Sequence, residues 1–148
     1  MKVMIALDDS IYSKHYLKEL AKRTWPKNTN FKLISVLEPL NLSETEKHQN
    51  LKDKINEQRH EHAQQFLHTM KDELDSVPGS IVHFEIREGN ADEQIIESCI
   101  DWKPDRLFIG AYGKGQASSR LGKTALGVVS NSPCSVEVMR NKELLPTL

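Results

Sequence analysis

The sequence predicts an α/β protein built on a parallel, doubly wound sheet. Five of its six prolines lie between periodic segments, and proline fits neither a helix interior nor a central strand. The segments that they separate alternate between strand-like and helix-like hydrophobic patterns. Strands that alternate with helices are joined by right-handed crossovers, so this order favours parallel strands covered by helices. The five prolines are Pro26, Pro39, Pro78, Pro104 and Pro133.

Five segments have the composition of strands. Residues 3–7 are a continuous apolar run, and residues 107–109 are a shorter one, as expected of strands buried on both faces. Residues 31–37 are predicted as a strand that follows the first helix. In residues 82–86 and 135–139, apolar and polar side chains alternate, which is typical of a half-buried strand.

Four helices are expected between these strands. Ser10 or Ser13 can cap the first helix through its hydroxyl group. Residues 43–46 and 90–93 have the spacing of capping boxes, and they open the second, long helix and the third. The fourth helix is expected over about residues 123–130. No internal repeat interrupts this order.

The composition is typical of one soluble globular domain. The chain has 148 residues, of which 38% are hydrophobic and 28% charged, and its formal net charge is −1. This balance is too apolar for general disorder, and near-neutral charge argues against binding nucleic acid through bulk electrostatics. No apolar run approaches the about 20 residues of a membrane span. We therefore expect one domain over residues 1–140, a loose tail at 141–148, and neither nucleic acid nor membrane as a partner.

Neither the cysteines nor the histidines predict a metal site. Cys99 and Cys134 form neither a CxxC pair nor a disulfide framework, which favours a reducing, cytoplasmic setting. Cys99 lies among the apolar residues of a helix and is expected in the core, whereas Cys134 is expected to be partly exposed. No two of the six histidines have three- or four-residue helical spacing. We interpret those of the long helix as part of a solvated face.

A glycine-rich loop follows the fourth predicted strand. Five of the seven glycines lie between positions 110 and 127, and the loop precedes a helix. Such a loop exposes backbone N–H groups, and the helix N-terminus adds partial positive charge, so phosphate is a plausible ligand. Lys114, Arg120 and Lys123 add full positive charges. The alternative is a tight strand-to-helix turn that needs glycine for positive φ, and the glycines alone leave the two interpretations about even.

The chain resembles the universal stress protein family over almost its full length, from residues 1–8 through residues 132–139. Nucleotide-binding members of that family carry Gly-x-x-Gly, nine residues, and then Gly-Ser or Gly-Thr. Gly110-Ala-Tyr-Gly113 matches the first part of this motif. Counting back from Pro133-Cys134 places the later glycine of the motif at Gly122.

Two features depart from the family pattern. The spacer between Gly113 and Gly122 has eight residues, and Lys123 stands where a small hydroxyl residue is usual, with Thr124 one place late. These departures favour an alternative, a dimeric stress or scaffold protein whose degenerate site binds no nucleotide. The retained glycines favour a nucleotide site.

The resemblance implies a Rossmann-like fold of the adenine nucleotide alpha hydrolase type, with sheet order 3-2-1-4-5. Strands 1 and 4 are then neighbours where the strand order reverses, which is where such sheets bind ligands. By the same resemblance Asp8 lies near the sugar or base, and the backbone of Val36 faces the base. The implied nucleotide-binding residues are Asp8, Val36, Gly110, Gly113, Gly122, Lys123 and Thr124.

The resemblance also implies a function, a stress-response regulatory protein that binds ATP or AMP, with Mg²⁺ accompanying ATP. No residue is marked as a catalytic base or nucleophile, so we expect no enzyme, although slow ATP hydrolysis stays open. The last strand alternates Val136 and Val138 with polar residues, and the resemblance puts it at a sheet edge. Because an exposed edge is normally paired or covered, we expect a homodimer joined through this strand.

Overall fold

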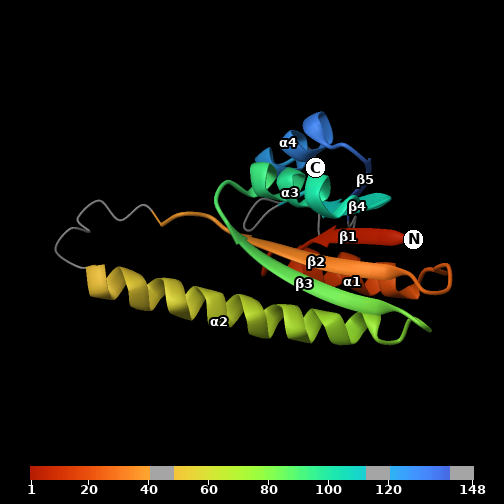
Figure 1. The fold of residues 1–148 in the computed structure, drawn as a ribbon, viewed down its shortest axis with the longest axis horizontal. Coiled ribbons are helices and arrows are strands. Elements are labelled where there is room, and N and C mark those ends of the chain that lie inside the picture. Colours follow the sequence, from red (N-terminus) through yellow and green to blue (C-terminus); the bar gives the residue numbers. More distant parts are fainter. Residues whose placement is uncertain (41–48, 113–120, 141–148) are drawn as a thin grey trace, which may run out of the picture.

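The computed structural model describes residues 1–40, 49–112 and 121–140. Within them, strands and helices alternate as the sequence predicts (Figure 1). In chain order the elements are β1 (Lys2–Ala6), α1 (Ile11–Lys22), β2 (Asn30–Leu37), α2 (Gln49–Leu74), β3 (Ile81–Glu88), α3 (Ala91–Trp102), β4 (Arg106–Gly110), α4 (Lys123–Asn131) and β5 (Ser135–Met139).

The five strands form one parallel sheet in the order β3-β2-β1-β4-β5, which confirms the predicted fold class and strand order. In the central strand, Ile5 is in register with Leu33 of β2 and Phe108 of β4. The chain moves outward from β1 to β3, then returns across the sheet to β4. This reversal places the carboxyl ends of β1 and β4 side by side, as expected at the switch point of a doubly wound sheet.

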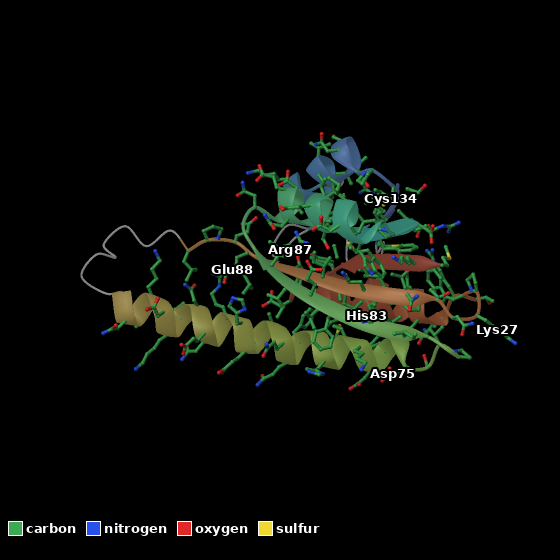
Figure 2. All side chains as sticks on the ribbon, viewed as in Figure 1. Lys27, Asp75, His83, Arg87, Glu88 and Cys134 are labelled. Carbon is green, nitrogen blue, oxygen red and sulfur yellow. The ribbon has the colours of Figure 1, made fainter. Side chains whose placement is uncertain are left out.

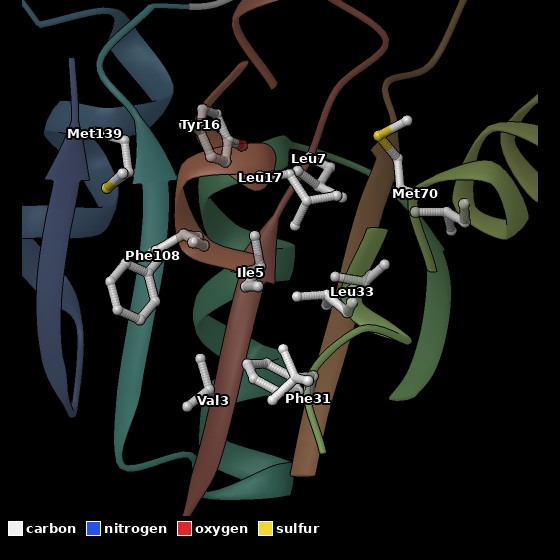
Figure 3. Close-up of a cluster of buried hydrophobic side chains, with 14 residues drawn as sticks. Val3, Ile5, Leu7, Tyr16, Leu17, Phe31, Leu33, Met70, Phe108 and Met139 are labelled. Atoms are coloured by element: carbon white, nitrogen blue, oxygen red, sulfur yellow. The ribbon is translucent and has the colours of Figure 1, made fainter. Parts of the chain in front are cut away.

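Helices cover both faces of the sheet, α1 and α2 on one side and α3 and α4 on the other (Figure 1). Successive residues of β1 point to opposite faces, so Val3 and Ile5 are buried beneath α1 and α2, whereas Met4 and Ala6 are buried beneath α3 and α4. Figure 3 shows the first of these two cores. Burial on both faces explains why residues 3–7 are apolar without alternation.

Helix α2 extends beyond the sheet at its N-terminal end (Figure 1). The apolar residues at helical spacing along α2 therefore have two different environments: Leu74 is fully buried, whereas Leu51 is 54% exposed. Val77 continues this helical spacing in the sequence, but it lies beyond the end of the helix at Leu74. Periodicity predicted the helix correctly, but it carries no information about where the supporting sheet stops.

The helix-start predictions have different outcomes. Ser10 is the N-cap of α1, and its hydroxyl accepts a hydrogen bond from the Ser13 backbone N–H at 3.4 Å. The capping box expected at residues 90–93 is wrong in its side-chain bond: Asn90 is the N-cap of α3, but its side chain makes no cap bond. The acidic Asp92 and Glu93 lie in the first turn instead, where they interact favourably with the helix dipole. The box at residues 43–46 lies outside the described residues.

Charged side chains, rather than apolar ones, join α3 to the edge strand β3. The Nζ atom of Lys32 lies 3.1 Å from Glu85 Oε2. Arg87, which is labelled in Figure 2, bonds both Glu85 and Asp101 of α3, the latter at 3.0 Å. Partial burial alone would raise the pKa of Glu85, but hydrogen bonds from Arg87 and Lys32 outweigh it and hold that pKa below its usual range.

No helix in the part of the chain that the structure describes is long and apolar enough to cross a membrane.

Candidate functional site

A cavity of about 300 Å³ lies at the carboxyl ends of β1 and β4, and we call it the switch-point cavity. Ala6 and Leu7 at the end of β1, and Ile109 and Gly110 at the end of β4, line it. Loops and helix ends complete its walls. Six of the seven residues expected to bind nucleotide line this one cavity: Asp8, Val36, Gly110, Gly122, Lys123 and Thr124. The seventh, Gly113, lies outside the described residues.

Asp8 is held in place by the first turn of α1. Its Oδ1 atom accepts hydrogen bonds from the Ser10 backbone N–H and the Ser13 hydroxyl, both at 2.9 Å. The Asp8 backbone N–H in turn donates to Ser13 Oγ at 3.0 Å. Asp8 therefore shapes the turn that opens α1. Both bonds fall on Oδ1, so Oδ2 is the oxygen available to accept a ligand hydroxyl.

Tyr16 of α1 forms a wall of the cavity that the sequence did not indicate. Its hydroxyl donates a hydrogen bond to the carbonyl oxygen of Ala6, and the side chain is 5% exposed. Burial raises the pKa of this phenol above its usual range, so Tyr16 stays neutral at physiological pH. A buried tyrosine on an amphipathic helix resembles any core aromatic residue, so no sequence signal separates it from the core.

Close approach, rather than backbone conformation, explains the glycine at position 110. The φ angles of Gly110 and Gly122 lie outside the positive range, in contrast to those of Gly79 and Gly89. A Cβ atom on Gly110 would lie 2.8 Å from Cε1 of Tyr16, nearer than carbon atoms approach without a shift. The positive-φ alternative therefore does not account for Gly110.

The N-terminus of α4 forms the opposite wall. Gly122 is the N-cap residue, and its N–H donates to the Ala111 carbonyl at 2.8 Å, which joins the two ends of the glycine-rich loop. Lys123 and Thr124 follow in the first turn, which contains no acidic residue. Free N–H groups and the dipole of a nine-residue helix favour an anion at this wall.

A second cavity, of about 580 Å³, adjoins the first, and we call it the α2 cavity. The residues common to both lie beyond the end of β1, at the end of β2 and at the starts of α3 and α4: Asp8, Val36, Glu38, Ala91 and Thr124. The histidines of α2 were expected on a solvated face, but the other wall of this cavity is a face of α2 that includes His62. Its polar members are Gln58, Arg59 and His62. Arg59 donates to the carbonyl oxygen of Glu38 at 2.7 Å, so this face approaches the end of β2.

Two of the three histidines of α2 pair with carboxylates, and the third, His68, packs against the ring of Phe84. His60 bonds Glu88 of β3, and Nε2 of His62 lies 3.6 Å from Oδ2 of Asp9. Among the described residues, no group of three or more histidine, cysteine, aspartate or glutamate side chains could hold a metal ion.

The model of the universal stress protein family matches residues 1–140 of the sequence. The chain belongs to this family. The match includes every strand of the sheet and both walls of the switch-point cavity. No curated protein matches the sequence.

Solved structures of the same fold agree with this assignment. Hypothetical protein MJ0577 has 23% identity and a TM-score of 0.82, with 95% of this chain and 96% of that one covered. Universal stress protein UspA from Lactobacillus plantarum has 17% identity and a TM-score of 0.81, with coverages of 95% and 97%. A family member from Arabidopsis thaliana with AMP bound has 18% identity and a TM-score of 0.67, with coverages of 99% and 97%. At these identities, the likeness establishes the fold.

Two further structures in the comparison contain nucleotides. One is a universal stress protein in complex with cAMP, at 15% identity and a TM-score of 0.67. The other is the universal stress protein from Archaeoglobus fulgidus in complex with dAMP, at 15% identity and a TM-score of 0.63.

Proposed function

We propose that this universal stress protein is a regulatory protein that binds an adenine nucleotide, ATP or AMP, in the switch-point cavity. The observation that carries the proposal is the convergence of Asp8 and the N-terminus of α4 on one cavity at the point where strand order reverses. The AMP, cAMP and dAMP bound to proteins of the same fold support this class of ligand.

Each wall has a distinct role in the proposal. Oδ2 of Asp8 accepts a ribose hydroxyl, and the backbone of Val36 faces the base. The first turn of α4, from Gly122 to Thr124, binds the phosphate through its N–H groups. Gly110 lets the ligand and Tyr16 approach the same strand end without a Cβ atom between them.

We further propose that the ligand acts as a signal rather than a substrate. In this reading, nucleotide occupancy changes the stability of the protein or its choice of partner during stress. Mg²⁺ enters only with ATP, held by its phosphates, because the described residues offer no cluster of metal-binding side chains. An assay of ATP turnover tests the proposal, and a turnover far above that of a denatured sample would contradict it.

Identifying the ligand carried by the native protein tests the proposal against its alternative. Mass spectrometry of small molecules released from the freshly purified protein is expected to find AMP or ATP in near-stoichiometric amount. The alternative is a scaffold protein without nucleotide, and the short spacer and Lys123 favour it. Protein that carries no nucleotide and acquires none on incubation with AMP and ATP would support the scaffold protein.

Lys123→Ser is expected to weaken ATP binding about tenfold while adenosine affinity stays unchanged. Lys123 is the exposed first residue of α4, where the helix dipole disfavours a cation by about 0.3–1 kcal/mol. A bound phosphate makes the electrostatic environment of Lys123 favourable, because the ammonium and the helix N–H groups then share one anion. Titrations of the variant with ATP and adenosine measure the difference, which added salt should reduce.

The matched control is Lys22→Ser, which removes a cation from the last turn of α1 and should leave ATP affinity within about twofold. If Lys123→Ser binds ATP as well as the wild type does, Lys123 extends into solvent and has no phosphate role.

We also propose a homodimer in which β5 pairs with its symmetry mate. β5 is an edge strand of the sheet, and Leu126 and Val129 of the neighbouring α4 are 56% and 45% exposed. The carbonyl oxygen of Met139 faces β4, where it accepts from Ala111 N–H at 2.9 Å. Because backbone groups alternate along a strand, those of Val138 face outward and are available to a second copy.

Val138→Pro is therefore expected to convert the dimer to a monomer without unfolding it. Proline removes the outward N–H of Val138 and keeps the ladder between β4 and β5. Sedimentation velocity at about 50 μM measures the change, with a wild-type dimer and a monomeric variant expected. A monomeric wild type at that concentration would exclude the proposed dimer.

A further inference from the structure

The two cysteines of the chain lie in the same hydrophobic core, although 35 positions separate them in sequence. Cys99 of α3 is 1% exposed, and its thiol lies 3.6 Å from the sulfur of Met4. Cys134 precedes β5 and packs against the same cluster from its margin (Figure 2). Both side chains are free thiols.

The sheet geometry explains why the two cysteines share one core. Side chains alternate between the faces of a strand, so Cys134 points to the same face as Val136 and Val138, beneath α3 and α4. Val136 is in register with Leu107, and Leu107 with Met4, the residue that Cys99 contacts. Cys99 and Cys134 therefore belong to one packed cluster, Cys99 in its interior and Cys134 at its margin.

We propose that Cys99 and Cys134 are an oxidation site, at which a peroxide converts the two thiols to an intramolecular disulfide. Cys134 is the partly exposed member of the pair and meets the oxidant, whereas Cys99 is the buried partner that resolves the oxidised sulfur. The disulfide would tie the middle of α3 to the start of β5.

The chemistry balances in two steps. The Cys134 thiolate attacks hydrogen peroxide, an S–O bond forms while the O–O bond breaks, and hydroxide leaves, giving a sulfenic acid. The sulfur of Cys99 then attacks the sulfur of Cys134 and loses its proton, the S–O bond breaks, and water leaves. Two thiols are oxidised to one disulfide, and one peroxide is reduced to two waters.

Burial of Cys99 slows the second step, the formation of the disulfide. Removal from solvent and the neighbouring Cys134 together raise the pKa of the Cys99 thiol to about 12. Since the thiolate is the attacking form, the disulfide should close slowly at neutral pH and faster as pH rises. The sulfenic acid of Cys134 should therefore accumulate long enough to be trapped by dimedone.

The test uses the full-length protein and its Cys99→Ser and Cys134→Ser variants, each treated with hydrogen peroxide and followed by intact mass and peptide mapping. For the wild type we expect a loss of two hydrogen atoms, a peptide that links Cys99 to Cys134, and a higher melting temperature. Cys99→Ser is expected to stop at a dimedone-reactive Cys134 and then gain further oxygen. Cys134→Ser is expected to leave the buried Cys99 unmodified.

Three results would overturn the proposal. The first is a wild type that gains oxygen atoms without cross-linking. The second is a disulfide that joins two chains in place of one between Cys99 and Cys134. The third is oxidation of Cys99 in Cys134→Ser at the wild-type rate, which would show that Cys99 reacts without its partner.

Discussion

Leu33→Ala is expected to lower the free energy of unfolding by about 3–5 kcal/mol. Leu33 lies in the middle of β2, in register with Ile5 of β1 and Phe84 of β3, and its side chain is fully buried between the sheet and the two N-terminal helices. Truncation removes buried methyl groups and leaves a cavity that the strand ladders on both sides keep open. Chemical denaturation measures the change, which should also lower the melting temperature by about 10 °C.

The matched control is Leu51→Ala in the projecting part of α2, where the same side chain is 54% exposed. The free energy of unfolding of this variant should stay within about 0.5 kcal/mol of the wild type. Similar losses in the two variants would mean that the projecting end of α2 is buried in the protein as it exists in solution.

Asp8→Ala is expected to weaken AMP binding by about 10- to 100-fold, the effect of losing a hydrogen bond to a charged group. The reason is geometric: Ser10 and Ser13 fix the carboxylate through Oδ1, so the ribose hydroxyl that we propose for Oδ2 would bind without rearrangement of Asp8. Calorimetric titration with AMP measures the affinity. A thermal melt of the same sample separates loss of binding from loss of fold, because Asp8 also shapes the first turn of α1.

Asp9→Ala is the matched control, because Asp9 adjoins Asp8 but lines only the α2 cavity and pairs with His62. Its AMP affinity should stay within about threefold of the wild type. Equal losses in the two variants would indicate a general electrostatic effect of removing a carboxylate, in place of a specific contact from Asp8.

The sequence predicted the elements of this fold better than their neighbours in space. Hydrophobic alternation in residues 82–86 and 135–139 identified two strands, and the structure places these at the two sheet edges. Periodicity is a local property, however, and says nothing about which strands pair. The order 3-2-1-4-5 came from the family resemblance, which rests on motifs spread over the whole chain.

The candidate site was also predicted only in part, because local sequence patterns do not show which residues are neighbours in space. Asp8 was implied by the family resemblance, and Gly110 was predicted from the glycine-rich loop that follows a buried strand; the structure brings both to one cavity. Tyr16 and the Arg59 face of α2 were missed, since a helix position that closes a cavity has the same spacing as one that packs in the core or faces water. Tertiary contacts alone decide whether a helix residue lines a cavity, packs in the core or faces water.

Titration of ligand-free protein with AMP by isothermal calorimetry tests the central proposal most directly. We expect saturable binding of one AMP per chain, competition from ATP, and much weaker binding of the same AMP to Asp8→Ala. Absence of saturable binding by AMP and by ATP, each raised to about 1 mM, would contradict a nucleotide site in the switch-point cavity.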